Sequence, residues 1–194
     1  LSLFENKTVK NLLKDELFLL ILQKSLIADV LIEKVLTKIR YEILFSYYDS
    51  KKKFPNENLN FIFSLAEQCF LNEYVFFQSD KETDYIDKLK NSLENGNITD
   101  FETAIIGCYI PLYTLKNISN KLIKYNSSNL LFNDLVKMEI KEPIKEKKLI
   151  NSIKSFGKIH DEISIKVRDQ YEKNPYPRWR YTYSNLHSNF LKIL

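Results

Sequence analysis

Glycine and proline, the residues that most often form tight turns, are scarce in this chain, which has three Gly and five Pro among its 194 residues. A β-sandwich or barrel needs a tight turn at the end of almost every strand, and these two residues supply the backbone angles of most such turns. The sequence therefore argues against an all-β fold and favours long elements joined by few turns.

Apolar residues recur at helical spacing through most of the chain. The clearest case runs from about Asp29 to Tyr48, where every fourth residue is apolar and charged residues occupy positions between. A strongly apolar segment at 12–24 precedes it, and a third helix is expected over about 57–78. The members of the four-residue repeat are Leu31, Val35, Ile39 and Ile43.

Helix starts are marked by a capping signal that occurs twice. Ser79 and Glu82 have the spacing at which a hydroxyl and a carboxylate satisfy the free amides of a first helical turn, and Thr99 and Glu102 repeat it. Pro111 falls inside the helix expected after Thr99, so a kink is predicted just before the proline.

Together these segments predict an all-α fold, an irregular multi-helix array or bundle that ends in an extended proline-aromatic strap. Shorter helices are expected over about 129–140 and 144–153, and a last one from Asp161. No strand pattern competes, and no repeat with a period in the thirties is recognisable. We expect a helical accessory domain over 1–160, followed by a helix and the strap over 161–194.

Net charge and cysteine content limit the kinds of partner that the sequence predicts. The formal net charge of +4 comes from lysines spread along the chain and does not call for nucleic acid. Cys69, Cys108 and the two histidines are scattered, which predicts reduced, buried thiols and no metal site. The longest early apolar run, 17–22, is far too short to cross a membrane, and no secretory signal is visible. A cytoplasmic protein is therefore expected.

One carboxylate falls on an apolar helix face. A buried carboxylate is costly unless it is paired or protonated, and arginine is scarce, so Arg40 or Arg168 is the expected partner of Glu73. Glu73 is then either half of an ion pair that fixes helix register or a site carboxylate facing a pocket, and its neighbours Asn72 and Tyr74 fit both. The apolar residues on that face are Leu59, Ile62, Ala66, Cys69, Phe70 and Phe77.

The strap, Asn174–Trp179, differs from its surroundings. A proline restricts the residue before it to extended geometry, so Pro175 and Pro177 make the segment stiff and close to polyproline. Tyr176 and Trp179 present large apolar faces, and Arg178 adds a charge suited to a carboxylate, a phosphate or an aromatic ring.

The helix ahead of the strap carries an apolar row that ends at Tyr171. Ile163, Val167 and Tyr171 are spaced at i, i+4 and i+8, as in an amphipathic helix that docks along its length. The strap is expected to lie either on the helices of this domain or at a junction with another domain, bordering a ligand pocket. Stacking on nucleic acid is a third reading, which the weak charge disfavours.

The stretch 167–179, "VRDQYEKNPYPRW", resembles a motif found in large bacterial proteins in which tetratricopeptide repeats precede a class I S-adenosylmethionine-dependent methyltransferase domain. "LTKIR" (36–40), "AEQCFLNEYVF" (66–76) and "EPIKE" (142–146) agree in order, so the resemblance spans roughly 12–180. Lys173 stands where a second acidic residue would be expected, and the upstream repeats are not recognisable. The resemblance implies a fragment, the helical region just ahead of the methyltransferase domain.

By this resemblance the catalytic domain should follow the strap and is missing from the chain. A class I methyltransferase needs a strand that runs into a glycine-rich loop, and Gly96, Gly107 and Gly157 stand alone. No catalytic, cofactor-binding or metal-binding residue is therefore carried over, and S-adenosylmethionine is expected only for the missing domain. The implied function is an accessory region, inactive by itself, that packs on that domain in cis and helps to place substrate. The alternative is a free-standing helical module that binds another protein.

Overall fold

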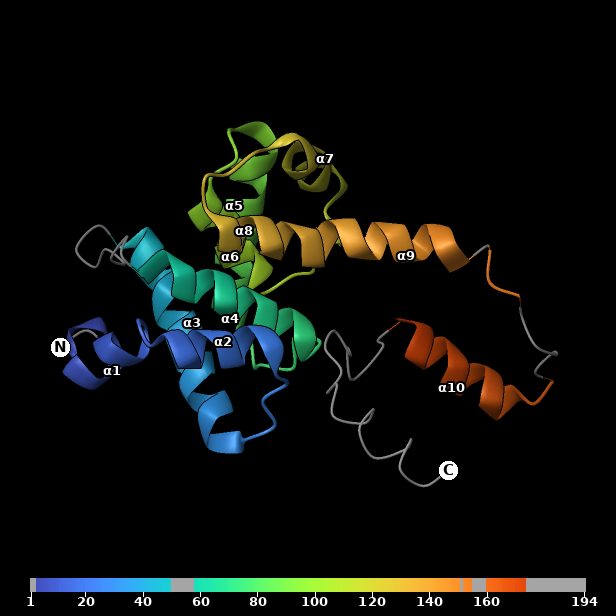
Figure 1. Cartoon of the computed structure of the whole chain (residues 1–194), viewed down its shortest axis with the longest axis horizontal. Coiled ribbons are helices and arrows are strands. Elements are labelled where there is room, and N and C mark those ends of the chain that lie inside the picture. Colours follow the sequence, from blue (N-terminus) through green and yellow to red (C-terminus); the bar gives the residue numbers. More distant parts are fainter. Residues whose placement is uncertain (1–2, 50–57, 151, 155–159, 174–194) are drawn as a thin grey trace, which may run out of the picture.

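The computed structural model of the chain describes residues 3–49, 58–150, 152–154 and 160–173, and every regular element in these ranges is helical (Figure 1). The predicted all-α class is confirmed for this part of the chain. The strap lies outside the described residues, so its extended geometry stays a prediction. The helices are α1 (Lys7–Leu12), α2 (Glu16–Lys24), α3 (Val30–Tyr48), α4 (Leu59–Leu71), α5 (Asp80–Asn95), α6 (Asp100–Gly107), α7 (Lys116–Lys124), α8 (Leu130–Val136), α9 (Glu142–Ile150) and α10 (Glu162–Lys173), with short turns η1 (Leu3–Glu5), η3 (Leu112–Thr114) and η4 (Lys137–Lys141).

Helix α4 is the centre of the helical body. Every side chain from Phe61 to Leu71 is buried, and α4 packs against α2, α6 and α8. Figure 1 shows α4 running between α2 on one side and α6 and α8 on the other. Each buried leucine or phenylalanine contributes about 1.5–3 kcal/mol by leaving water, so α4 supplies much of the stability of the body. The expectation of a central helix that is apolar nearly all round is confirmed.

The C-terminal end of α4 differs from the prediction. The helix ends at Leu71 rather than near residue 78, because Glu73 and Tyr74 have φ values of 56° and 58°. This left-handed geometry cannot continue a right-handed helix. The Asn72 side chain supports the reversal by accepting a hydrogen bond from the Tyr74 N–H at 3.1 Å. Glu73 is half-buried and does not lie on the apolar face of α4, so the sequence-based placement of this carboxylate was wrong.

Both predicted capping signals start a helix. The Ser79 hydroxyl accepts from the Glu82 N–H at 3.4 Å, and the Glu82 carboxylate accepts from the Ser79 N–H at 2.8 Å, which completes the capping box of α5. The Thr99 hydroxyl accepts from the Glu102 N–H at 3.3 Å at the start of α6. These predictions are confirmed.

Two other boundaries also differ from the sequence-based expectations. The helix expected to kink before Pro111 instead ends at Gly107, and Pro111 opens the η3 turn. A proline ring would collide with the preceding helical turn, and ending the helix relieves that collision without a bend. The apolar segment at 12–24 is likewise divided, because α1 ends at Leu12 and Asp15 caps the separate helix α2.

Helices α8 and α9 are joined by a π-helical turn. The segments predicted over 129–140 and 144–153 follow one another through η4 without a break in sequence. A π turn widens the helix locally and is frequent at functional sites. Its residue Glu139 is 0% exposed, although the neighbouring lysines Lys137 and Lys141 face solvent.

The last described helix, α10, begins where the sequence predicts. The Asp161 carboxylate accepts from the Ser164 N–H at 2.8 Å, which caps the first turn. Figure 1 shows α10 apart from the helical body. Within the described ranges no helix combines the length and the apolar character that a membrane span requires.

Candidate functional site

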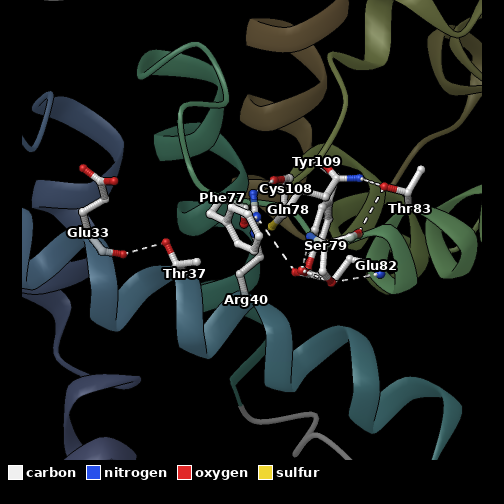
Figure 2. Close-up of polar contacts among 10 residues, drawn as sticks. All are labelled: Glu33, Thr37, Arg40, Phe77, Gln78, Ser79, Glu82, Thr83, Cys108 and Tyr109. Carbon is white, nitrogen blue, oxygen red and sulfur yellow. Dashed lines mark hydrogen bonds and ion pairs between the residues drawn. The ribbon is translucent and has the colours of Figure 1, made fainter.

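A buried arginine joins three elements of the body. Arg40, on α3, is 2% exposed, and its Nη1 donates to the Cys108 carbonyl at 3.2 Å while its Nη2 donates to the Phe77 carbonyl at 2.6 Å. The guanidinium carbon lies 4.1 Å from the centre of the Tyr109 ring. Figure 2 shows these groups converging between α3, the end of α6 and the segment before α5. Arg40 therefore fixes the positions of three elements that are far apart in sequence.

The carboxylate that pairs with Arg40 is Glu82. Arg40 Nη2 lies 3.9 Å from Glu82 Oε1, and the same oxygen accepts from the Tyr109 hydroxyl at 2.8 Å. The predicted kind of contact, a buried carboxylate with Arg40, is present, but the assignment to Glu73 was wrong. The capping box of α5 turns Glu82 toward α3, whereas the chain reverses before Glu73. Arg168, the other predicted partner, pairs with Asp169 at 2.7 Å on α10.

The Tyr109 hydroxyl remains protonated in this environment. Burial raises the pKa of Tyr109, and the nearby Glu82 carboxylate raises it further, whereas the Arg40 guanidinium has the opposite effect. A neutral phenol can donate to Glu82 while the arginine neutralises the carboxylate charge. The Glu82 carboxylate is thus paired with a cation and hydrogen-bonded, as a buried charge requires, whereas Arg40 Nε has no hydrogen-bond partner among the described residues.

A second buried carboxyl belongs to Glu139 in η4. Its Oε2 accepts from the Leu112 N–H at 3.1 Å and from the Tyr74 hydroxyl at 3.2 Å, and its Oε1 has no hydrogen-bond partner among the described residues. Burial raises the pKa of Glu139 well above the ordinary value, although these two hydrogen bonds lower it. Burial therefore favours the neutral acid over the carboxylate.

Cys69 and Cys108 meet between these two groups. Cys69 lies on α4 and Cys108 directly follows α6, and their thiols are close enough that each shifts the pKa of the other. Burial disfavours the Cys69 thiolate, but the neighbouring Cys108 thiol and the Arg40 guanidinium lower the pKa of Cys69 below its ordinary value. Burial and the neighbouring Cys69 raise the pKa of Cys108 well above it. Two residues that look scattered in the sequence therefore form one buried dithiol.

The surface over the Arg40–Glu82 pair is hollowed. A cavity of about 460 Å³ has an apolar wall in which Phe77 is 75% exposed. A second cavity of about 510 Å³ shares Lys38 and Tyr41 with the first. Both cavities are lined by residues of α3 and of the start of α5. The remaining lining residues are Glu33, Lys34, Thr37, Ser79 and Glu82 in the first, and Glu42, Phe45, Tyr48, Asp49, Lys81 and Tyr85 in the second.

The candidate residues named from the sequence lie in three parts of the chain: the buried network, α10 and the strap. Arg40 and Tyr74 belong to the buried network, and Asn72 and Glu73 form the turn that aims Tyr74 at Glu139. Arg168 and Tyr171 lie on α10, and the strap is outside the described part of the chain. Two of the motifs that carry the family resemblance, 36–40 and 66–76, thus supply adjoining parts of one network. Among the described residues, no cluster of His, Cys, Asp and Glu side chains could hold a metal ion.

Sequence reasoning missed Glu82, Glu139 and the pairing of the cysteines. A usable signal existed for Glu139, which lies four residues after Leu135 and three after Val136, on the apolar face of its helix. Glu82 was recognised as a capping residue, but capping does not reveal which element its second oxygen meets. No local signal indicates that the two cysteines are neighbours.

Comparisons with known proteins identify no relative of the chain. No family model, curated protein or solved structure matches it. Its function is therefore inferred from the motifs in the sequence and from the geometry of the described residues.

Proposed function

We propose that this chain is the helical accessory region of a longer S-adenosylmethionine-dependent methyltransferase polypeptide. In this proposal it docks on the catalytic domain through α10 and the strap, and it helps to cover or place the substrate. The cofactor and the catalytic residues belong to the domain that follows. The observation that carries the proposal is the uncovered apolar face of α10.

The apolar row of α10 is open to solvent in the described structure. Ile163 is 72% exposed, Val167 is 45% exposed and Tyr171 is 60% exposed. A helix of 12 residues is only marginally stable alone in water, and most helical stability in proteins comes from packing of the apolar face. A helix of this length and pattern therefore calls for a surface that covers its apolar row.

The position of α10 indicates which surface that is. The helix ends at Lys173 and passes directly into the strap, whose prolines and aromatic residues extend the same apolar character. A stiff segment loses little entropy when it docks. The motif 167–179 resembles the region just ahead of a methyltransferase domain, so the partner proposed for α10 and the strap is that domain, in cis.

A second candidate function is a free-standing module that binds another protein. The observation that favours it is the cavity of about 460 Å³ beside the exposed Phe77, with the exposed Leu31 and Val35 also on α3. Such a site would accept an apolar side chain from a partner. This function requires no downstream domain, and that difference separates the two candidates.

The test begins with the source gene beyond codon 194. An in-frame strand and glycine-rich loop would provide the intact protein for a matched pair of variants. In one, Ile163, Val167 and Tyr171 become serine. In the control, Glu162, Lys166 and Gln170 of the adjacent polar row become serine. We expect the apolar-row variant alone to separate the melting of the helical body from that of the catalytic domain in calorimetry, and to lower methyl transfer.

Two outcomes would refute the methyltransferase proposal. One is a reading frame that continues without any methyltransferase domain or stops soon after codon 194. The other is an intact enzyme whose melting and activity are the same in both variants. A reading frame without a methyltransferase domain would favour the second candidate function. That function is then tested by whether a protein partner binds wild type but not a variant changed at Phe77.

A further inference from the structure

We propose that Cys69 and Cys108 form a redox-sensitive dithiol, which a small peroxide converts into a disulfide that links α4 to the end of α6. This inference does not depend on the proposed function. It depends on the contact between the thiols, on the close approach of the two helices and on the arginine beside them.

The two helices approach closely where the cysteines lie. Cys69 is 0% exposed and Cys108 is 2% exposed, and their thiols are close enough that each shifts the pKa of the other. Cys108 Sγ also lies 3.9 Å from the Ile62 carbonyl oxygen of α4. A Cβ added at Gly107 would be 3.4 Å from the Ala66 Cβ, so the end of α6 rests directly on α4. Disulfides need such proximity, because their Cα atoms are usually within about 7 Å.

The surroundings give the two thiols different roles. The Arg40 guanidinium, whose Nη1 donates to the Cys108 carbonyl, lowers the pKa of Cys69, and a cation near a thiol favours the thiolate that reacts with oxidants. Burial and the neighbouring Cys69 raise the pKa of Cys108, so it retains its proton. Cys69 is therefore the attacking sulfur and Cys108 the resolving one.

The reaction balances with hydrogen peroxide as the oxidant. The Cys69 thiolate attacks one peroxide oxygen, the O–O bond breaks, and the hydroxide that leaves takes up a proton to form water. Cys69 is now a sulfenic acid. The Cys108 sulfur loses its proton and attacks the Cys69 sulfur, the S–O bond breaks, and a second water leaves as the disulfide forms. Two thiols lose two electrons and two protons, and the peroxide is reduced to two waters.

Burial restricts which oxidant can reach the site. A small, uncharged peroxide needs little opening of the α4–α6 contact, whereas oxidised glutathione is large and charged. We therefore expect a disulfide within the chain and no glutathione adduct while the protein is folded. This selectivity distinguishes a built site from a generally reactive thiol.

The test uses the full reduced chain in its folded form. After peroxide treatment the protein is unfolded, alkylated and weighed, and its peptides are mapped. We expect a product about 2 Da lighter than the reduced chain, without alkylation and with Cys69 linked to Cys108. Oxidised glutathione should leave both thiols free for alkylation.

Single variants test the two roles. In Cys108→Ser, Cys69 should form a sulfenic acid that dimedone traps. In Cys69→Ser, Cys108 should react at least about tenfold more slowly, because it has no stabilised thiolate. In wild type unfolded in urea, the two cysteines should lose this difference in rate.

Three results would overturn the proposal: a folded wild-type chain that keeps both thiols alkylatable, a disulfide between two molecules, or equal reactivity of the two single variants. If a serine variant fails to fold, the peptide map of the wild type still decides whether the bond forms.

Discussion

Glu139 shows how the fold sets the chemistry of a single residue. Its carboxyl is fully buried in η4, and its two hydrogen-bond donors come from Leu112 and Tyr74, which belong to distant parts of the chain. These donors are too few to offset the desolvation of a full charge, so the pKa is raised. Between the unfolded and the folded pKa of this carboxyl, the folded state therefore binds a proton that the unfolded chain releases.

Glu139→Gln tests this protonation state. An unfolded glutamate titrates near pH 4.3, so above that pH wild type must take up a proton to fold, and its stability falls as pH rises, by up to about 1.4 kcal/mol per pH unit for this one group. A glutamine is neutral in both states and lacks this dependence. We expect the variant to gain stability relative to wild type between about pH 5 and pH 8, as measured by urea unfolding. A difference that stays constant over this range would show that Glu139 is ionised in the fold.

At the scale of secondary-structure elements, some helix ends are set by residues close in sequence and others by contacts with distant residues. The caps of α5 and α6 are predictable, because the hydroxyl and the amide it accepts from are three residues apart in sequence. The end of α4 is not, because a left-handed Tyr74 is held by its hydroxyl contact with Glu139, which lies 65 residues farther along the chain. Left-handed geometry at a tyrosine persists only where surrounding contacts compensate its cost.

The end of α5 also depends on a distant residue. Lys121, on α7, donates through Nζ to the carbonyls of Leu93, Glu94 and Gly96 at 2.9, 2.7 and 3.0 Å. Lys121→Met should lower the free energy of unfolding by about 1–3 kcal/mol, because it removes charge-assisted hydrogen bonds. The matched control Lys124→Met, on the exposed side of α7, should change it by less than about 0.5 kcal/mol. Equal urea midpoints for the two variants would mean that Lys121 does not cap α5.

At the scale of the whole molecule, stability is concentrated in the body around α4. The amides of α4 lie among fully buried side chains, whereas α10 has an exposed apolar row. Local opening is easiest where few buried contacts hold a segment. The isolated chain should therefore consist of a stable body followed by a less stable helix, α10.

Hydrogen exchange measures this difference directly. We expect the amides of α4 to exchange last, through global unfolding, and those of α10 to exchange at least about a hundredfold faster in the isolated chain. If α10 docks as proposed, it should become protected in a longer polypeptide that includes a methyltransferase domain. Protection of α10 equal to that of α4 in the isolated chain would mean that it packs on its own body, contrary to the proposed docking.

The sequence by itself determined the helical class, the capped starts of α5, α6 and α10, and the central place of α4. Each of these follows from residues within one or two helical turns of each other, where spacing translates directly into geometry. The sequence also indicated that a buried carboxylate should pair with one of the scarce arginines, Arg40 or Arg168, because a buried charge is costly unless it is paired.

Only the tertiary structure decided which carboxylate pairs with Arg40, that Glu139 is buried with a raised pKa, and that Cys69 lies near Cys108. These facts depend on how α3, α4, α5 and α6 pack, and the spacing of residues along the chain carries no distance between separate helices. The packing is the collective result of many apolar contacts, so a change at any one element could have brought different polar groups together. The candidate sites of this protein are therefore products of its packing, whereas its helices are products of its local sequence.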